Sequence, residues 1–135
     1  MLHRMTDVDV TGMTVIVADD DDELRDHIAD ALRTDGYKVV EARDGEEVLG
    51  LVADSVSDTA TRPDVVVVDV RMPKLSGLGV LEELRRTYRL PVVVITGFSP
   101  DSVEVVARRL GAMAGLRKPL DMDDLRTAIV NARPR

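Results

Sequence analysis

The sequence predicts an α/β fold in which helices cover both faces of a central five-stranded parallel sheet. Five short apolar runs, rich in β-branched residues, alternate with five segments of helical periodicity. Val65–Val68 and Val92–Ile95 are apolar at every position, which a strand tolerates only where both of its faces are covered. We therefore expect these two strands at the centre of a three-layer sandwich with right-handed βαβ crossovers.

Each apolar run is too short for a helix and is expected to form one strand. In chain order the expected strands are Met13–Ala18, Tyr37–Glu41, Val65–Val70, Pro91–Ile95 and Ala112–Leu116. The segment after each strand carries an apolar stripe with the spacing of an amphipathic helix. In the same order, these stripes are Leu24, Ile28, Ala31 and Leu32; Val48, Leu49, Leu51 and Val52; Leu78, Leu81 and Leu84; Val103, Val106 and Leu110; and Leu125, Ile129 and Val130.

Length and composition fit a single domain. The chain has 135 residues, 44% of them hydrophobic, which is enough for one sizeable core. We expect residues 1–12 to be a flexible N-terminal tail and residues 13–132 to form the folded domain. The polar loop Asp54–Arg62 is longer than a tight connection requires, and no function is assigned to it.

Charge and cysteine content exclude several classes of protein. The formal charge is −7 and the arginines are interleaved with acids, so nucleic-acid binding by this chain alone is not expected. No apolar run is long enough for a membrane helix, and Asp7 and Asp9 interrupt the stretch that a signal peptide would need. The sequence contains no cysteine, so it has no disulfide framework. A cytoplasmic location is therefore expected.

Polar residues follow four of the expected strands. Asp19–Asp22 come after the first strand, Asp69 ends the third, Thr96 follows the fourth and Lys118 follows the fifth. In an open parallel sheet, ligands bind beyond the carboxyl ends of the strands. These residues are therefore the candidates for a functional site.

The four consecutive aspartates admit two explanations. Acids at a helix N-terminus cap free amides, which accounts for one or two of them. Asp19 and Asp20, however, leave the buried strand before the helix begins, and carboxylates that converge with Asp69 would repel one another. A hard divalent cation with oxygen ligands, most simply Mg²⁺, would remove this repulsion.

Asp69, Thr96 and Lys118 together suit phosphoryl transfer. A carboxylate can attack phosphorus to form an acyl phosphate, while an ammonium and a hydroxyl bind the phosphoryl oxygens. Taken singly, each residue has a simpler explanation, as a strand-end acid, a strand-terminating hydroxyl or a solvated lysine. Their joint presence at the strand ends favours the chemical role.

Four stretches carry a family resemblance: VIVADDDDELR, VVVVDVRMP, VVVITGF and LRKP. From about Met13 to Asn131 the chain resembles the receiver domain of two-component response regulators. The resemblance implies a flavodoxin-like fold with strand order 2-1-3-4-5. It also implies a phosphoacceptor role for Asp69, Mg²⁺ binding by Asp19, Asp20, Asp69 and the backbone carbonyl of Arg71, a switch hydroxyl on Thr96 and a phosphate-binding ammonium on Lys118.

The resemblance implies partners as well. The phosphoryl group is expected from a histidine on a sensor histidine kinase or a phosphotransfer protein, and neither His3 nor His27 is placed to be that donor. The target is a downstream protein or an output domain, since the chain is either a standalone receiver or part of a larger regulator or hybrid kinase. The resemblance leaves room for a weak homodimer. It also requires a cis Lys118–Pro119 bond, which aims the ammonium over the carboxylates.

Three residues shape how the domain is expected to work. Gly115 stands where the family usually has Tyr or Phe, so activation is expected to move backbone after Thr96 and around the fourth helix rather than to rotate a ring. Arg71 and Phe98 lie two residues after the phosphoacceptor and the switch hydroxyl, respectively. We expect both side chains to shield the phosphoryl group from water.

Two other classes of function remain open. A phosphohydrolase of the haloacid dehalogenase type also uses a strand-end aspartate, and Asp19 with Asp21 mimics its DxD motif, although Glu23 stands where that motif continues with threonine. A binding module that works without phosphorylation is disfavoured because all the site residues are present. The three are distinguished by one stable phosphoryl group, many turnovers of a phosphomonoester, or neither.

Overall fold

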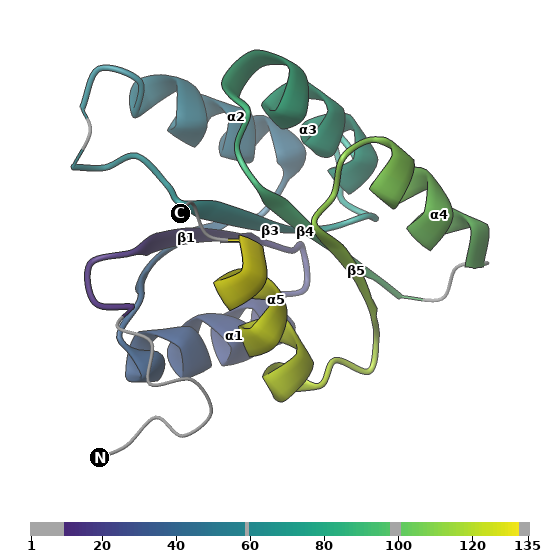
Figure 1. Ribbon diagram of the computed structural model, residues 1–135, viewed down its shortest axis with the longest axis horizontal. Coiled ribbons are helices and arrows are strands. Elements are labelled where there is room, and N and C mark those ends of the chain that lie inside the picture. The colour runs from purple at the N-terminus through teal and green to yellow at the C-terminus, as the bar shows by residue number, and fades with distance from the viewer. Residues whose placement is uncertain (1–9, 59, 98–100, 133–135) are drawn as a thin grey trace.

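The computed structural model describes residues 10–58, 60–97 and 101–132. Within them five strands alternate with five helices (Figure 1). The strands are β1 (Thr14–Ala18), β2 (Lys38–Ala42), β3 (Val65–Asp69), β4 (Val92–Thr96) and β5 (Ala114–Arg117). The helices are α1 (Asp22–Asp35), α2 (Gly45–Asp54), α3 (Gly77–Glu83), α4 (Asp101–Arg109) and α5 (Met122–Ala132), and α3 continues into a π-helical turn, η1 (Leu84–Tyr88).

The five strands form one parallel sheet in the order β2-β1-β3-β4-β5. This order confirms the flavodoxin-like topology. The two strands that are apolar at every position, β3 and β4, lie inside the sheet and are buried along their whole length, as predicted. Strand β1 also lies inside the sheet, and its last residue, Ala18, pairs with Val68. The next residues, Asp19 and Asp69, therefore lie at the same carboxyl edge of the sheet.

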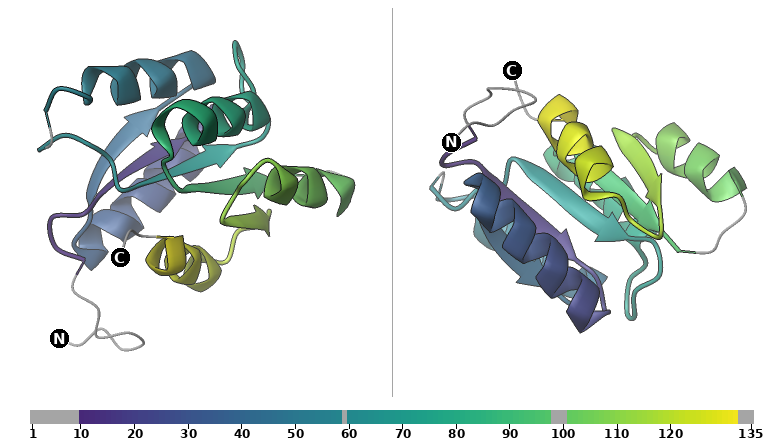
Figure 2. Two further views of the ribbon diagram at one scale, coloured as in Figure 1. Left: turned by 45° about the horizontal axis from the view of Figure 1, so that its top comes forward. Right: turned by 90° about the horizontal axis from the view of Figure 1, so that it is seen from below.

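Helices cover both faces of the sheet. One face packs against α1 and α5, and the other against α2, α3 and α4, as the two views of Figure 2 also show. Alternate valines of the central strands enter opposite layers: Val65 and Val67 face α1 and α5, whereas Val66 and Val68 face the other helices. This alternation is the two-residue period of a strand, and it explains why both faces of these strands are apolar.

The ends of the elements differ from the predicted bounds by one or two residues. The largest difference is at β5, which begins at Ala114 rather than at Ala112. Ala112 donates its amide to the Ala107 carbonyl at 3.0 Å and therefore belongs to the end of α4. Met113 is apolar, but it lies in the connection and its side chain is 45% exposed. The apolar run alone did not separate the helix cap from the strand.

Strand β2 forms one edge of the sheet. The Lys38 amide donates to the Met13 carbonyl at 2.8 Å, so Lys38 faces β1. Val39, the next residue, directs its carbonyl outward, where it accepts a hydrogen bond from the guanidinium of Arg33 on α1 at 3.0 Å. A helix side chain thus covers part of the open edge.

The boundary between the expected tail, residues 1–12, and the folded domain stays a prediction. Residues 1–9 are outside the described part of the chain, so the expected tail is not tested there. Val10 is buried and packs in the core beside α1 and α5. Among the helices that the structure describes, none is both long enough and apolar enough to span a membrane.

Candidate functional site

The candidate residues meet at the carboxyl edge of the sheet. Asp69 is the last residue of β3 and is only 3% exposed. Its Oδ1 accepts a hydrogen bond from the Arg71 amide at 2.9 Å, and its Oδ2 accepts one from the Lys118 ammonium at 2.6 Å. One carboxylate oxygen is thus fixed by the backbone, while the other faces a cation.

Three carboxylates converge at this point. Asp19, Asp20 and Asp69 each offer an oxygen atom, and these oxygens lie within 4.8 Å of one another. Asp19 is buried and Asp20 is exposed, so the cluster opens to solvent on one side. Carboxylate oxygens at this spacing are the donor set that a hard divalent cation prefers.

Burial and the neighbouring charges perturb the pKa of Asp19. Burial raises the pKa of its carboxyl, the amide of Asp21 lowers it and the charge of Asp69 raises it further, so that the pKa moves from 3.8 to about 6. The Asp19 Oδ1 accepts from that Asp21 amide at 2.9 Å. A bound cation would stabilise the ionised form that the metal-free protein disfavours.

The last two aspartates of the run belong to the helix. The Asp21 carboxylate caps α1 and accepts a hydrogen bond from the Leu24 amide at 3.1 Å. Asp22 is the first residue of α1 and forms an ion pair with Arg25 at 2.7 Å. The run therefore divides between a helix cap and the acidic cluster. Because Asp21 points to the helix, the DxD motif of a phosphohydrolase is not formed.

Lys118 links the strands of the site. The bond between Lys118 and Pro119 is cis, as predicted, and the Lys118 amide donates to the Thr96 carbonyl at 2.8 Å. The ammonium reaches Asp69 and lies 3.4 Å from Oδ2 of Asp19. Burial lowers the pKa of Lys118, but the hydrogen bond and charge of Asp69 outweigh this effect, so the pKa is raised overall. The lysine is therefore charged at neutral pH.

Two buried oxygens of the site have no hydrogen-bond partner. They are Oδ2 of Asp19 and Oγ1 of Thr96, and no other buried side-chain oxygen or nitrogen in the described ranges is left in this state. Thr96 is the last residue of β4, next to β3, and is 2% exposed. Oδ2 of Asp19 lies 3.4 Å from the Lys118 ammonium but accepts no hydrogen bond. Because buried polar atoms are normally hydrogen-bonded, both atoms are available to a ligand. A cation beside Asp19 and an anionic oxygen beside Thr96 would satisfy them.

Gly77 is a structural requirement that the sequence analysis did not identify as part of the site. A side chain at this position would overlap the backbone carbonyl of Asp69. The Gly77 amide also donates to the Val70 carbonyl at 3.0 Å. The start of α3 is thereby held directly against the residue that carries the candidate nucleophile. A glycine at the start of a helix gave no distinct signal in the sequence.

Gly115, which stands in β5 where an aromatic residue was expected, lies against α4. A Cβ atom at Gly115 would lie 3.5 Å from Cγ of Glu104 on α4. The carboxylate of Glu104 accepts a hydrogen bond from Arg117 on the same strand at 2.5 Å. The pair of Arg117 and Glu104 thus bridges β5 and α4 beside Gly115.

The remaining predicted residues lie at the margin of the site. Arg71 follows β3, and its side chain is exposed. Phe98, the second expected shield, is outside the described residues, as is His3. His27 lies exposed on α1.

Comparisons with known proteins agree with this geometry. Residues 15–130 match the family described as response regulator receiver domain. The transcriptional regulatory protein PdtaR of Mycobacterium tuberculosis is 37% identical over 131 residues, which cover 96% of this chain and 61% of that regulator. The chain thus spans less than two thirds of this relative.

Two solved structures have the same fold. The receiver domain of Francisella response regulator 1452 is 27% identical, with a TM-score of 0.80 over 89% of this chain and 95% of that one. The CheX-CheY complex of Borrelia burgdorferi, solved with BeF3 and Mg²⁺, is 21% identical, with a TM-score of 0.79 over 88% of this chain and 87% of that one.

Proposed function

Since this chain belongs to the response regulator receiver domain family, we propose that it accepts a phosphoryl group on Asp69 from a histidine kinase or a histidine phosphotransfer protein. It is a phosphorylatable signalling module rather than a conventional enzyme. The observation that carries the choice of Asp69 is the hydrogen bond of 2.6 Å between its buried Oδ2 and the Lys118 ammonium. The two buried oxygens of the same site that lack a hydrogen bond support it.

The side chains of the site divide the chemistry among them. An Asp69 oxygen attacks the phosphorus of the donor, and the bond from phosphorus to the donor histidine breaks. The Arg71 amide holds the other oxygen of Asp69 and so fixes the direction of attack. The Lys118 ammonium and the Thr96 hydroxyl bind the phosphoryl oxygens, which carry the negative charge of the transition state.

We propose Mg²⁺ as the cofactor. Asp19, Asp20 and Asp69 would hold it, with the backbone carbonyl of Arg71 as a further ligand. The convergent oxygens support this assignment, as does Oδ2 of Asp19, which accepts no hydrogen bond. When bound, Mg²⁺ neutralises the carboxylates and the charge of the phosphoryl oxygens. The structure of the Borrelia burgdorferi complex contains Mg²⁺ within the same fold.

The proposed signalling role requires a phosphodonor and a recipient of the signal. The donor is a kinase or phosphotransfer protein, and the recipient of the signal is a protein target or an output domain, since the chain covers 61% of its PdtaR relative. We further propose a cytoplasmic location and no direct contact with nucleic acid or membrane. Any homodimer would be weak. Arg71 would shield the acyl phosphate from water.

The decisive experiment uses acetyl phosphate and Mg²⁺ with intact-mass measurement. The parent should gain one phosphoryl group, and the Asp69→Asn variant should gain none. A phosphohydrolase would instead turn over a phosphomonoester many times, and a phosphorylation-independent binding module would do neither. Equal labelling of the parent and the Asp69→Asn variant, located by peptide mapping to the same residue in both, would refute the assignment of the nucleophile.

A further inference from the structure

Arg25 is a buried arginine on α1. The residue is only 8% exposed and shares the inner face of the helix with Ile28, Ala29 and Leu32. An arginine is rarely buried unless its charge is paired, because removing the guanidinium from water is costly. Its contacts therefore show what its position accomplishes.

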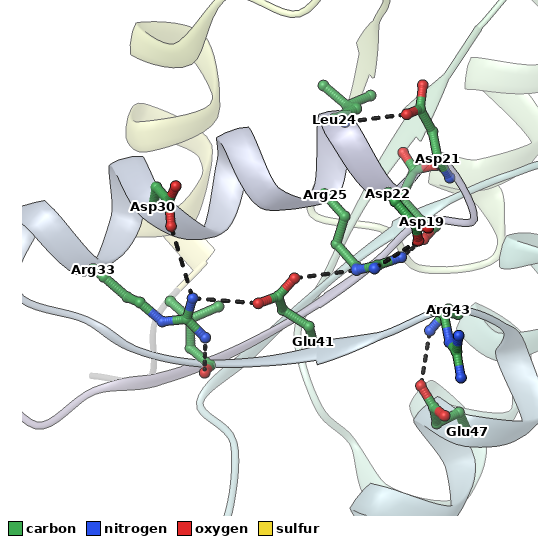
Figure 3. A network of polar contacts seen from close by, with 11 residues as sticks. Asp19, Asp21, Asp22, Leu24, Arg25, Asp30, Arg33, Glu41, Arg43 and Glu47 are labelled. Atoms are coloured by element: carbon green, nitrogen blue, oxygen red, sulfur yellow. Dashed lines mark hydrogen bonds and ion pairs between the residues drawn. The ribbon is translucent and has the colours of Figure 1, made fainter.

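The guanidinium joins three segments of the chain (Figure 3). One terminal nitrogen donates to the backbone carbonyl of Asp19 at 2.8 Å. Nε donates to Glu41 on β2 at 3.1 Å, and the other terminal nitrogen pairs with Asp22 at 2.7 Å. The Asp22 side chain is 71% exposed and that of Glu41 is 27% exposed, so solvent screens the Glu41 pair less.

These contacts hold the main chain of Asp19 from two directions. Its amide donates to the Ala42 carbonyl of β2 at 3.1 Å, and its carbonyl accepts from Arg25, which Glu41 of β2 holds in turn. A peptide unit is planar, so the direction of the Asp19 carbonyl also sets the direction in which the chain enters Asp20. Arg25 thus fixes the peptide unit between the first two carboxylates of the cluster.

We propose that Arg25 is a positioning residue for the cation site. Through its bond to the Asp19 carbonyl, it orients the peptide unit between Asp19 and Asp20, so that both carboxylates are already placed for a divalent cation. Groups that orient metal ligands in this way strongly influence metal affinity. The inference rests on the proposed function, because it takes the acidic cluster as the Mg²⁺ site.

A purely structural role would require less of this side chain. The ion pair with Glu41 ties α1 to β2, the pair with Asp22 stays within α1, and a lysine could form either one. Contact with both carboxylates and the Asp19 carbonyl at once needs the planar fork of donors that arginine provides. Neither ion pair reaches the main chain of Asp19, so the bond to the Asp19 carbonyl is the contact that distinguishes the two roles.

Arg33 offers a matched control. It lies on the same helix, two turns further along, and pairs with the same Glu41 carboxylate at 3.3 Å. It also contacts Asp30 and the Val39 carbonyl, and Figure 3 shows it away from Asp19. An Arg33→Gln variant therefore removes a guanidinium from the network without touching the acidic loop.

The test is Mg²⁺ titration of the unphosphorylated protein, followed by amide chemical shifts. Arg25→Gln should weaken Mg²⁺ binding by about tenfold. Arg25→Lys should recover part of the loss, and Arg33→Gln should bind within about twofold of the parent. In the metal-free Arg25→Gln protein, the amides of residues 20–22 should exchange with solvent faster, while those of β3 should not. Parent affinity in Arg25→Gln, or an equal loss in Arg33→Gln, would overturn the proposal.

Two further measurements keep the outcomes distinct. If Arg25→Gln does not fold, Glu41→Gln removes the less exposed of the two carboxylates that hold Arg25 and should weaken Mg²⁺ binding by about threefold; parent affinity there would overturn the proposal. Phosphorylation of the parent is measured separately with acetyl phosphate. A parent that is phosphorylated on Asp69 while Arg25→Gln binds Mg²⁺ normally would overturn the role of Arg25 alone. A parent that binds Mg²⁺ but is never phosphorylated would overturn the proposed function alone.

Discussion

The site lies between two corners of the sheet that are packed very differently. At the corner of β1 and α1, both main-chain groups of Asp19 are hydrogen-bonded, and α1 buries four side chains. At the corner of β4, α4 and β5, residues 103–109 bury only Ala107, while Val105 and Val106 are 49% and 41% exposed. The first corner carries Asp19 and Asp20, the second carries Thr96 and Gly115, and Asp69 lies between them at the end of β3.

This difference separates chemistry from response. Cation binding needs carboxylates that stay in place, whereas a signal needs a segment that can move at little cost in free energy. The exposed valines, the glycine and the single buried alanine make the second corner the less stable one. We therefore expect phosphorylation to move backbone around α4 and to leave β1 and α1 unchanged.

Lys118 bridges the two corners, and its loss should have the largest effect. Its ammonium contacts both Asp69 and Asp19. Lys118→Ala should lower the rate of phosphorylation by acetyl phosphate at least about 100-fold, because it removes a positive charge aimed at the transition state. Intact-mass time courses measure this rate. Lys74→Ala, which removes an exposed lysine, serves as the control, and a loss below about threefold in Lys118→Ala would contradict the role.

The two acids of the first corner should contribute unequally to Mg²⁺ binding. Asp20 is exposed, whereas Asp19 already accepts the Asp21 amide and faces Lys118. Asp20→Asn should therefore weaken Mg²⁺ binding by about tenfold or more, and Asp19→Asn by less. Chemical-shift titration of both variants measures the difference. Equal losses would mean that the two carboxylates are equivalent ligands.

Asp19, the buried acid of the first corner, should lower the free energy of unfolding of the metal-free protein at neutral pH. The pKa of Asp19 is about 6 in the folded protein, against 3.8 for an unperturbed carboxyl. The folded state therefore holds more protons between these values, and stability should fall as pH rises from about 4 to about 6. One pKa unit corresponds to about 1.4 kcal/mol, so Asp19→Asn should stabilise the metal-free protein at pH 7 by at most about 3 kcal/mol.

Urea unfolding at pH 5 and pH 7.5, with and without Mg²⁺, measures this effect. The increase in the free energy of unfolding of Asp19→Asn over the parent should be larger at pH 7.5 than at pH 5. Added Mg²⁺ should raise the free energy of unfolding of the parent and so reduce this difference. Asp20→Asn, which removes an exposed acid from the same loop, should change the free energy of unfolding by no more than about 0.5 kcal/mol. A destabilised Asp19→Asn protein at pH 7.5 would show that the acid contributes stability instead.

The smallest effect is expected at the second corner. A Cβ atom at Gly115 would make ordinary contact with Glu104, and glycine in a strand is about 0.5–1 kcal/mol less favourable than alanine. Gly115→Ala should therefore raise the free energy of unfolding by about 0.5 kcal/mol without changing the phosphorylation rate. A loss above about 1 kcal/mol would mean that α4 is packed as tightly as α1.

Much of the fold and of the site could be predicted because each depends on local patterns. The uninterrupted valine runs identified the central strands, and the polar residues at strand ends identified Asp19, Asp69, Thr96 and Lys118. The strand order came from the family resemblance rather than from periodicity. Which acids bind and which cap the helix was settled only by geometry, because neighbouring aspartates differ in direction and not in chemistry.

Contacts between distant segments were harder to predict. The overlap between Gly77 and the Asp69 carbonyl depends on how α3 approaches β3, which no local pattern encodes. Arg25 did give a signal, since it lies three residues before Ile28 and so falls within a buried helical stripe. A charged residue in such a stripe predicts a buried partner, but it does not identify the carbonyl of Asp19.

The hydrogen bond from Arg33 to the outer carbonyl of Val39 affects how the molecule behaves at high concentration. Open sheet edges invite a strand from another chain, which leads to aggregation or strand exchange. Here a cationic side chain occupies the carbonyl of the second residue of β2, an acceptor that an incoming strand would need. Growth of the sheet across this edge is therefore disfavoured at that position.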